Sequence, residues 1–139
     1  MSIPPTIEHL SHELAAGRTT AVALAEAALA RARDPAGEGA RVFTALGTER
    51  ALAAARASDL LRAAGVVRSP LEGIPVSIKD LFDVAGEVTT AGSAVLRGAA
   101  PAERNAPVVE RLIAAGAVIV GRTNMTEFAF SGLGLNPHH

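Results

Sequence analysis

The sequence contains no cysteine, so its own residues cannot supply a disulfide, a thiolate zinc site or a cysteine nucleophile. It also lacks tryptophan and tyrosine, and its aromatic residues are four phenylalanines. Much of the apolar content is alanine. Because small side chains bury little area, we expect a thin core that relies on neighbouring structure.

Strong charge of either sign is also absent. The formal net charge is −1, and no Lys/Arg cluster accompanies an aromatic stripe, so no nucleic-acid partner is expected. No apolar run approaches the roughly 20 residues that a membrane helix needs. The first residues also lack the basic and then apolar pattern of a secretory leader. We therefore expect a soluble, cytoplasmic protein without a membrane partner.

The length of 139 residues suits one domain, or one piece of a larger domain. Helices are predicted where a capping threonine precedes an apolar face and a glycine or proline follows. Residues 1–65 are accordingly expected to be mainly helical, and residues 66–139 to form the α/β part of the same domain, with no complete second domain. The predicted elements of the first part are helices at 6–17, 19–33 and 48–64, and a strand at 41–46.

The second part predicts a β-α-β unit. Residues 74–78 (IPVSI) and 117–120 (AVIV) are short, β-branched runs typical of buried strands. Between them, Asn105 is expected to cap a helix at 105–116, with Pro107 in its first turn. Such a unit has parallel strands and a right-handed crossover.

Lys79 directly follows the first of these strands, and residues 121–131 follow the second. Ligands of such sheets collect beyond the carboxyl ends of the strands, so Lys79 becomes a site candidate by position. Beyond the second strand, Asn124 and Glu127 have the spacing of a capping box, which predicts a further helix.

Two other patterns carry no site. Residues 116–123 have the spacing of a phosphate-binding loop, but Arg122 replaces its lysine and the intervening residues are a predicted strand. His9 and His12 lie one helical turn apart, and a solvated helix face explains them. No metal site is expected, and whether His138 and His139 are native or a cloning remnant stays open.

An ordered set of motifs in the second half of the chain resembles the motifs of a known protein family. Residues 71–80 read LEGIPVSIKD, 89–93 read TTAGS, 105–109 read NAPVV and 116–128 read GAVIVGRTNMTEF. In order and spacing they resemble the N-terminal portion of the amidase signature family, serine amidohydrolases with a Ser-cisSer-Lys triad. The resemblance runs from about residue 70 to the end, and the opening helices are also similar. It implies an α/β fold with a mixed sheet flanked by helices, and hydrolysis of a small carboxylic acid amide without a cofactor.

The resemblance assigns Lys79 as the base of the triad. A lysine is a base only when neutral, and an unperturbed pKa of about 10.4 leaves roughly one in 2,500 neutral at pH 7. Desolvation by a buried setting can lower such a pKa, whereas a nearby carboxylate raises it. We therefore expect Asp80 to point away from the amine, as adjacent strand residues do.

The resemblance also shows what is missing. In the family, the Gly- and Ser-rich stretch with both serines and the oxyanion hole would follow residue 139. The nearest hydroxyls here, Ser77, Ser93 and Ser131, have no such setting. A chain that ended at 139 is thus expected to be inactive. Ala129, Phe130 and Ser131 are implied to line the acyl pocket of an apolar amide substrate, although core packing is an alternative for Ala129 and Phe130.

Two alternatives to a stand-alone amidase remain. The chain can be a non-catalytic remnant or interaction module that keeps the helical face of the fold. It can also be a segment of the A-subunit of a tRNA-dependent amidotransferase, which shares these motifs and needs partner subunits. A homodimer is left open.

Overall fold

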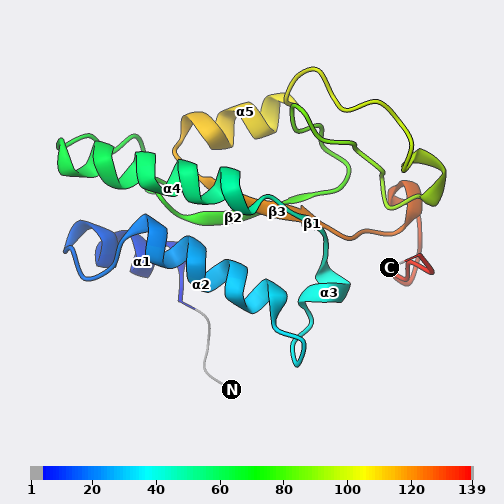
Figure 1. The fold of residues 1–139 in the computed structure, drawn as a ribbon, viewed down its shortest axis with the longest axis horizontal. Coiled ribbons are helices and arrows are strands. Elements are labelled where there is room, and N and C mark those ends of the chain that lie inside the picture. The colour runs from blue at the N-terminus through cyan, green and yellow to red at the C-terminus, as the bar shows by residue number, and fades with distance from the viewer. Residues whose placement is uncertain (1–4, 139) are drawn as a thin grey trace.

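The computed structural model describes residues 5–138 (Figure 1). The helices are α1 (Ile7–Ala15), α2 (Ala21–Arg33), α3 (Gly39–Val42), α4 (Thr48–Ala63) and α5 (Pro107–Ala114); the strands are β1 (Phe43–Leu46), β2 (Pro75–Lys79) and β3 (Val118–Thr123); the 3-10 turns are η1 (Ala94–Leu96) and η2 (Glu127–Ala129). The main helices and strands through β3 follow the predicted order, with the sheet between helical layers, whereas the turn α3 was not predicted and the helix predicted after Asn124 is only a 3-10 turn.

The three strands form one mixed sheet in the order β1-β3-β2. β2 and β3 are parallel, and α5 lies between them in the chain, which confirms the predicted β-α-β unit. β1 pairs with β3 in antiparallel orientation, so the first part of the chain contributes a strand to the same sheet. Within the described residues, β1 and β2 are therefore the edge strands, and β3 is central.

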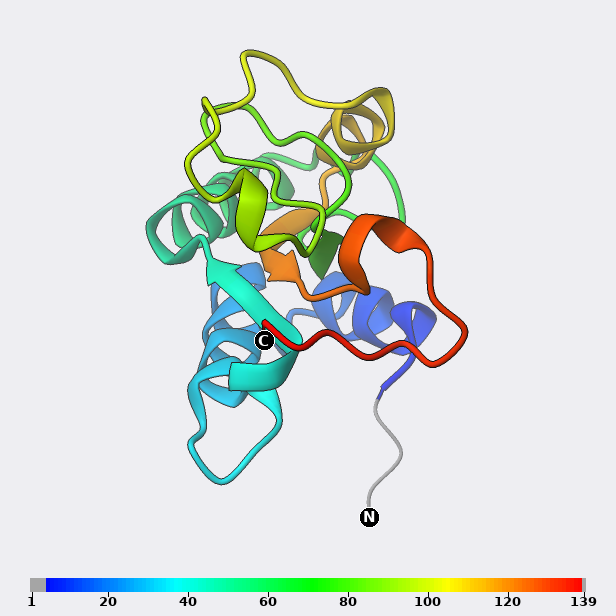
Figure 2. The same ribbon diagram turned by 90° about the vertical axis from the view of Figure 1, so that its right-hand side faces the viewer.

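Helices cover both faces of this sheet (Figure 2). On one face, Val118 and Val120 of β3 pack into a buried cluster with α2 and α4. On the other face, Ile119 packs with Val109 of α5. The helices contribute mostly alanine to the first cluster, as the composition predicted: Ala21, Ala25 and Leu29 from α2, and Ala51 and Ala55 from α4.

Two predicted helix starts in the first part of the chain are confirmed. The hydroxyl of Thr6 accepts a hydrogen bond from the His9 amide at 3.1 Å, and that of Thr20 accepts one from the Ala23 amide at 3.0 Å. These contacts satisfy amide groups that a helix leaves without internal partners. Asp59 of α4 also accepts hydrogen bonds from the first amides of α2, which ties the two helices together.

The strand predicted at 41–46 begins later, at Phe43. Arg41 and Val42 belong instead to the single turn α3, in which both amides donate to the carbonyl of Glu38 at 2.9 and 3.0 Å. This turn redirects the chain from α2 into the sheet. The ladder between β1 and β3 accordingly starts with the pair of Phe43 and Thr123.

Two predicted boundaries after residue 100 were also wrong. Asn105 does not cap α5; Ala106 stands at the cap, and the Asn105 side chain accepts from the Ala85 amide at 2.8 Å. β3 continues past the predicted end at 120 through Thr123. It does so because β1 and β2 both pair with this polar extension, which a local pattern cannot reveal.

Among residues 5–138, no helix combines the length and apolar character needed to cross a membrane.

Candidate active site at the carboxyl ends of β2 and β3

Lys79 is the last residue of β2, and its register partner is Thr123, the last residue of β3. The carboxyl ends of the two parallel strands therefore meet at one edge of the sheet, as predicted. Lys79 and Ser77 are exposed, whereas Ile78 between them is buried, in keeping with the alternation of a strand. Within the described residues, no ion pair involves Lys79. The burial that a lysine base needs is not provided by these residues.

The carboxylate of Asp80 is turned into the protein, away from the exposed side of Lys79. Its side chain is 1 % exposed. It accepts hydrogen bonds from the Thr90 amide at 3.3 Å, from the Thr90 hydroxyl and from the Gly92 amide at 3.4 Å. The predicted orientation of Asp80 is thus confirmed.

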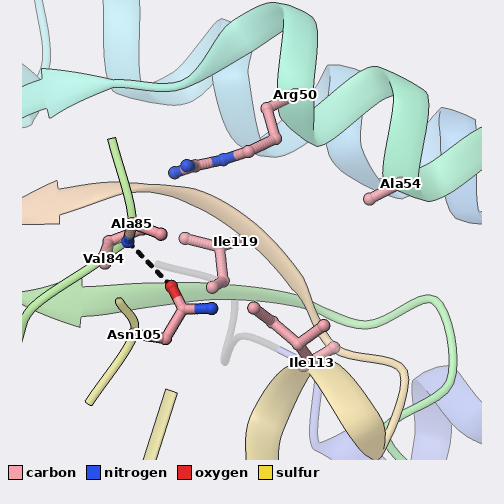
Figure 3. Close-up of a pocket in the computed structure, with 8 residues that line it drawn as sticks. Arg50, Ala54, Val84, Ala85, Asn105, Ile113 and Ile119 are labelled. Atoms are coloured by element: carbon pink, nitrogen blue, oxygen red, sulfur yellow. Dashed lines mark hydrogen bonds between the residues drawn. The ribbon is translucent and has the colours of Figure 1, made fainter. Parts of the chain in front are cut away.

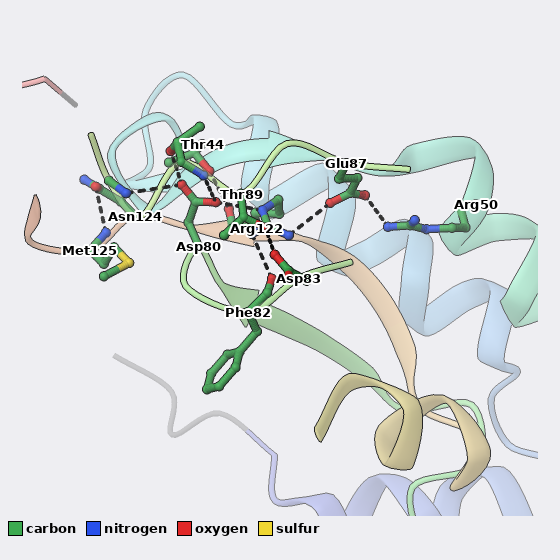
Figure 4. A network of polar contacts seen from close by, with 12 residues as sticks. Thr44, Arg50, Asp80, Phe82, Asp83, Glu87, Thr89, Arg122, Asn124 and Met125 are labelled. Atoms are coloured by element: carbon green, nitrogen blue, oxygen red, sulfur yellow. Dashed lines mark hydrogen bonds and ion pairs between the residues drawn. The ribbon is translucent and has the colours of Figure 1, made fainter. Parts of the chain in front are cut away.

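Arg122 of β3 is the ionic partner of Asp80 (Figure 4). Its Nε atom lies 2.8 Å from Asp80 Oδ1, and its side chain is only 3 % exposed. Its Nη2 atom donates to the Phe82 carbonyl at 2.9 Å and to the Thr89 hydroxyl at 3.2 Å. A buried guanidinium requires such partners because an unpaired buried charge is costly.

A chain of charges continues outward from this pair. Nη1 of Arg122 lies 3.4 Å from Glu87 Oε2, and Glu87 in turn pairs with Arg50 of α4. A hollow of about 500 Å³ adjoins Asp80 and Arg122 on the side of β1. A recess lined in part by charged side chains therefore lies beside Asp80, the residue that follows Lys79.

The segment after β3 folds back on the same edge. Asn124 does not form the predicted capping box, because its side chain donates to the Arg41 carbonyl at 3.2 Å and accepts from the Met125 amide at 2.8 Å. Glu127 accepts from the Ser93 hydroxyl at 2.6 Å instead of from an Asn124 amide. Only the short turn η2 follows, in place of a helix.

Ala129, Phe130 and Ser131 are all exposed, so core packing within this chain is wrong for Ala129 and Phe130. Phe130 is 94 % exposed. Ala129 and its neighbour Phe128 adopt positive φ angles of 61° and 53°. Such angles are unfavourable for residues with a Cβ and persist only where other contacts hold the backbone.

A second hollow, of about 290 Å³, lies between α4, α5 and the sheet (Figure 3). Its lining is mainly apolar and includes Ala54, Val84 and Ile119. Asn105 stands in its wall, where it donates no hydrogen bond in the described part of the chain and accepts one from Ala85. Among the described residues, this hollow gathers no cluster of reactive side chains, and Lys79 is not among the residues that line it.

In the part of the chain that the structure describes, no group of three or more His, Cys, Asp or Glu residues is placed to hold a metal ion. His9 and His12 lie on α1, far in sequence from the strand ends.

Sequence reasoning missed Arg122 and its contacts with loop 82–92. The local pattern marks Arg122 only as a departure from a phosphate-binding loop. Two signals could have located it: an acid that directly follows a buried strand, and an arginine near the carboxyl end of another. Since β2 and β3 are parallel neighbours, such residues meet at the same edge.

Comparisons with known proteins agree with this fold. The family model described as Amidase matches residues 23–138. The chain is 50% identical over 126 residues to the A-subunit of glutamyl-tRNA(Gln) amidotransferase from Chloroflexus aggregans, covering 89% of this chain and 25% of that protein. It is 44% identical to AtzE, a component of the 1-carboxybiuret hydrolase of a Pseudomonas species, covering 91% and 27%. The structure of the native peptide amidase from Stenotrophomonas maltophilia matches with a TM-score of 0.79 and 36% identity, covering 88% and 25%.

The chain spans about a quarter of the length of the curated relatives that it matches. The family match covers most of the sequence, including the edge with Lys79, Asp80 and Arg122. The chain therefore belongs to the amidase family, the amidase signature hydrolases.

Proposed function

We propose that the complete protein hydrolyses a linear carboxylic acid amide to an acid and ammonia or an amine, with Lys79 as the general base of a Ser-cisSer-Lys triad. The neutral amine of Lys79 would take a proton from the relay serine, which takes one from the nucleophilic serine. The hydroxyl oxygen would then attack the amide carbon, and the C–N bond would break as the leaving ammonia or amine takes back the proton from Lys79 through the relay serine. The resulting acyl-enzyme would be hydrolysed by water, which releases the acid and restores the serine.

The observation that carries this proposal is the identity and place of one side chain. Of the 13 Lys and Arg residues, twelve are arginine, and Lys79 is the single lysine. An arginine side chain stays protonated and cannot serve as a base, whereas a lysine can. The one Lys/Arg side chain that can lose its proton thus stands at the carboxyl end of a parallel strand, where ligands of such sheets generally bind.

The serines of the triad are proposed to lie outside residues 1–139. Ser93 is buried, and its hydroxyl donates to Glu127. The hydroxyl of Ser131 accepts a hydrogen bond from the Leu133 amide at 3.1 Å. Ser77 lies on the same exposed side of β2 as Lys79. None of these settings supplies the converging backbone amides that stabilise an oxyanion. The 139-residue chain alone is therefore proposed to be inactive.

The substrate is proposed to carry an apolar acyl group, bound by Ala129, Phe130 and Ser131. The exposed side chains of this segment support the proposal, because Phe130, Leu133 and Leu135 are at least 72 % exposed and offer apolar surface to a ligand. The cytoplasmic location expected from the sequence stays a prediction.

The test is ammonia release from a panel of linear primary amides by the protein expressed from its whole gene. Lys79→Ala and Lys79→Arg are each expected to lower kcat about 10²–10⁴-fold, because both remove the base. Ser77→Ala, at another exposed position on the same side of β2, is the matched control and should retain activity. Activity in the Lys79→Arg variant, or in the purified 139-residue chain, would contradict the proposal.

A second candidate is the A-subunit of an amidotransferase, favoured by the 50% identity to that component of the Chloroflexus aggregans enzyme. Co-purification of the native protein with partner subunits would support it, and a lone active amidase would exclude it. The intact mass of the native protein separates both from a remnant, since a mass of 14.1 kDa would leave no residues for the serines.

A further inference from the structure

We propose that Asp80 and Arg122 are positioning residues for Lys79. Arg122 holds the carboxylate of Asp80 away from the lysine amine. Asp80 in turn accepts hydrogen bonds from the loop around residues 90–92, which contacts segment 128–131. The inference rests on the proposed role of Lys79 as a base, and it deepens that role by naming what keeps the amine free of a counter-ion.

The need for such a device follows from the sequence. Asp80 is bonded directly to Lys79, so its carboxylate would be the closest counter-ion available to the amine. An ammonium group paired with a carboxylate holds its proton more tightly, which is the wrong direction for a base. Alternation along the strand turns the two side chains to opposite sides, but an exposed aspartate beyond the strand end could rotate back.

Arg122 prevents that rotation. It stands opposite Ile78 in the sheet register and brings its Nε to 2.8 Å from Asp80 Oδ1. Three further groups hold the guanidinium in place: the Phe82 carbonyl, the Thr89 hydroxyl and the Glu87 carboxylate. The planar guanidinium has fixed donor directions, so Asp80 and Arg122 cannot move separately without losing several contacts.

Asp80 also connects the base to the proposed acyl segment. Its carboxylate accepts from the amides of Thr90 and Gly92, and between them Ala91 is held at a φ of 49°. The carbonyl of Ala91 accepts a hydrogen bond from the Phe128 amide at 2.9 Å. One buried carboxylate thus orders the loop on which the strained start of segment 128–131 depends.

Other charges near this edge are already paired or lie on neighbouring elements. Glu87 is shared between Arg122 and Arg50, and Asp83 accepts from the Thr89 hydroxyl at 2.7 Å. Other charged groups on elements around β2 include Arg31 of α2, which lines the groove beside Ser77, Arg97, which lines the same hollow as Asp80, and Glu127 after β3. Of these acids, Asp80 is the one that neighbours Lys79 in the chain, so its pairing is expected to dominate.

The test is the rate at which an acylating reagent modifies Lys79 at pH 8, in the protein expressed from its whole gene. Only the neutral amine reacts, and the arginine-bounded peptide 69–97 contains no other lysine, so mass spectrometry reads this one site. An added free amine serves as the reference. Arg122→Gln leaves Asp80 uncompensated and should slow acylation about two- to five-fold. Asp80→Asn should accelerate it by a similar factor, and the double variant should return to within about two-fold of the wild type.

Two matched controls separate positioning from simple loss of structure. Arg122→Lys keeps the charge but loses the fork of hydrogen bonds, so it should disturb stability more than acylation. Arg68→Gln breaks the other buried-carboxylate pair, at the opposite end of β2, and should leave the Lys79 rate unchanged. Shifts of the same sign in Asp80→Asn and Arg122→Gln, or equal slowing in Arg122→Lys and Arg122→Gln, would overturn the inference.

Turnover distinguishes this inference from the proposed function. Acylation needs no amide hydrolysis, so unchanged acylation would refute positioning even if Lys79→Ala abolishes activity. Retained activity in Lys79→Ala would instead refute the base. If Lys79 is the base and Asp80 and Arg122 position it, the acidic limb of the kcat–pH profile should move to higher pH in Arg122→Gln and to lower pH in Asp80→Asn. The reason is that the base must be neutral.

Discussion

The two ends of strand β2 use the same chemistry for different purposes. Glu72 lies just before the strand and Asp80 just after it, and each is a buried carboxylate paired with an arginine. The pairs differ in where the arginine comes from and in what lies beside them. Their comparison indicates which buried ion pair serves packing and which serves a site.

At the beginning of β2, the contacts of Glu72 join the strand to the preceding loop and to α4. Glu72 accepts from Arg68, four residues earlier, at 2.5 and 2.7 Å, and from the Ser58 hydroxyl of α4. The hydrogen bonds from Arg68, with a smaller contribution from Ser58, lower the pKa of Glu72 to about 2 against the opposing effect of burial. Gly116 presses against this carboxylate, since a Cβ there would lie 2.6 Å from Glu72 Oε2. In the described chain, the groups that contact the Glu72 carboxylate thus hold neighbouring segments together.

At the end of β2, the arginine comes from the neighbouring strand and is itself buried. The residue bonded to Asp80 in the chain is the exposed Lys79. The exposed segment 128–131 is hydrogen-bonded to the loop that Asp80 holds. Arg68, by contrast, is 36 % exposed. A fully buried pair beside an exposed lysine is a candidate for function, whereas a pair whose arginine reaches solvent and has no such neighbour is a candidate for stability alone.

The largest expected effect comes from breaking the pair at the end of β2. Asp80→Ala leaves Arg122 buried without its main ionic partner and should lower the free energy of unfolding by about 3–5 kcal/mol. Urea denaturation followed by circular dichroism measures this. The matched variant Glu72→Ala should cost less, because Arg68 can turn its charge into solvent. A larger loss in Glu72→Ala would reverse the comparison.

A smaller effect is expected from pH at the beginning of β2. Because the folded-state pKa of Glu72 is lowered from 4.5 to about 2, its ionised form stabilises the fold above pH 4.5, and this contribution disappears as the pH falls through 2. The shift corresponds to roughly 3 kcal/mol.

The measurement compares wild type with Glu72→Gln, so that other titrating groups cancel. The difference in unfolding free energy should be constant above pH 4.5 and should shrink steadily toward pH 2. A difference that does not depend on pH would show that the lowered pKa does not contribute to stability.

The smallest effect is expected at the outer rim of the Asp80 network. The pair of Arg50 and Glu87 is partly exposed, so Arg50→Gln should cost about 0–1 kcal/mol, and high salt should remove the difference. Thermal unfolding at low and high salt checks this. A loss comparable to that of Asp80→Ala would mean that the whole chain of charges acts as one unit.

Local signals predicted much of the fold. Thr6 and Thr20 cap helices as expected, because a cap needs only residues three positions away. Lys79 was also placed correctly at a strand end. The extension of β3 was not predicted, since the burial of Arg122 depends on Asp80, 42 residues earlier in the chain. Asn105 was misassigned for the same reason: its partner, Ala85, is 20 residues away.

The alanine seam between α2, α4 and the sheet has a thermodynamic consequence. Ala21, Ala25, Ala51 and Ala55 are fully buried, yet their methyl groups remove little apolar surface from water and lose no rotamer freedom on folding. The heat-capacity change of unfolding should therefore fall below the usual ~12–15 cal/mol/K per residue. A smaller heat-capacity change flattens the dependence of stability on temperature, so this part of the protein should resist cooling better than a core built from leucine and phenylalanine.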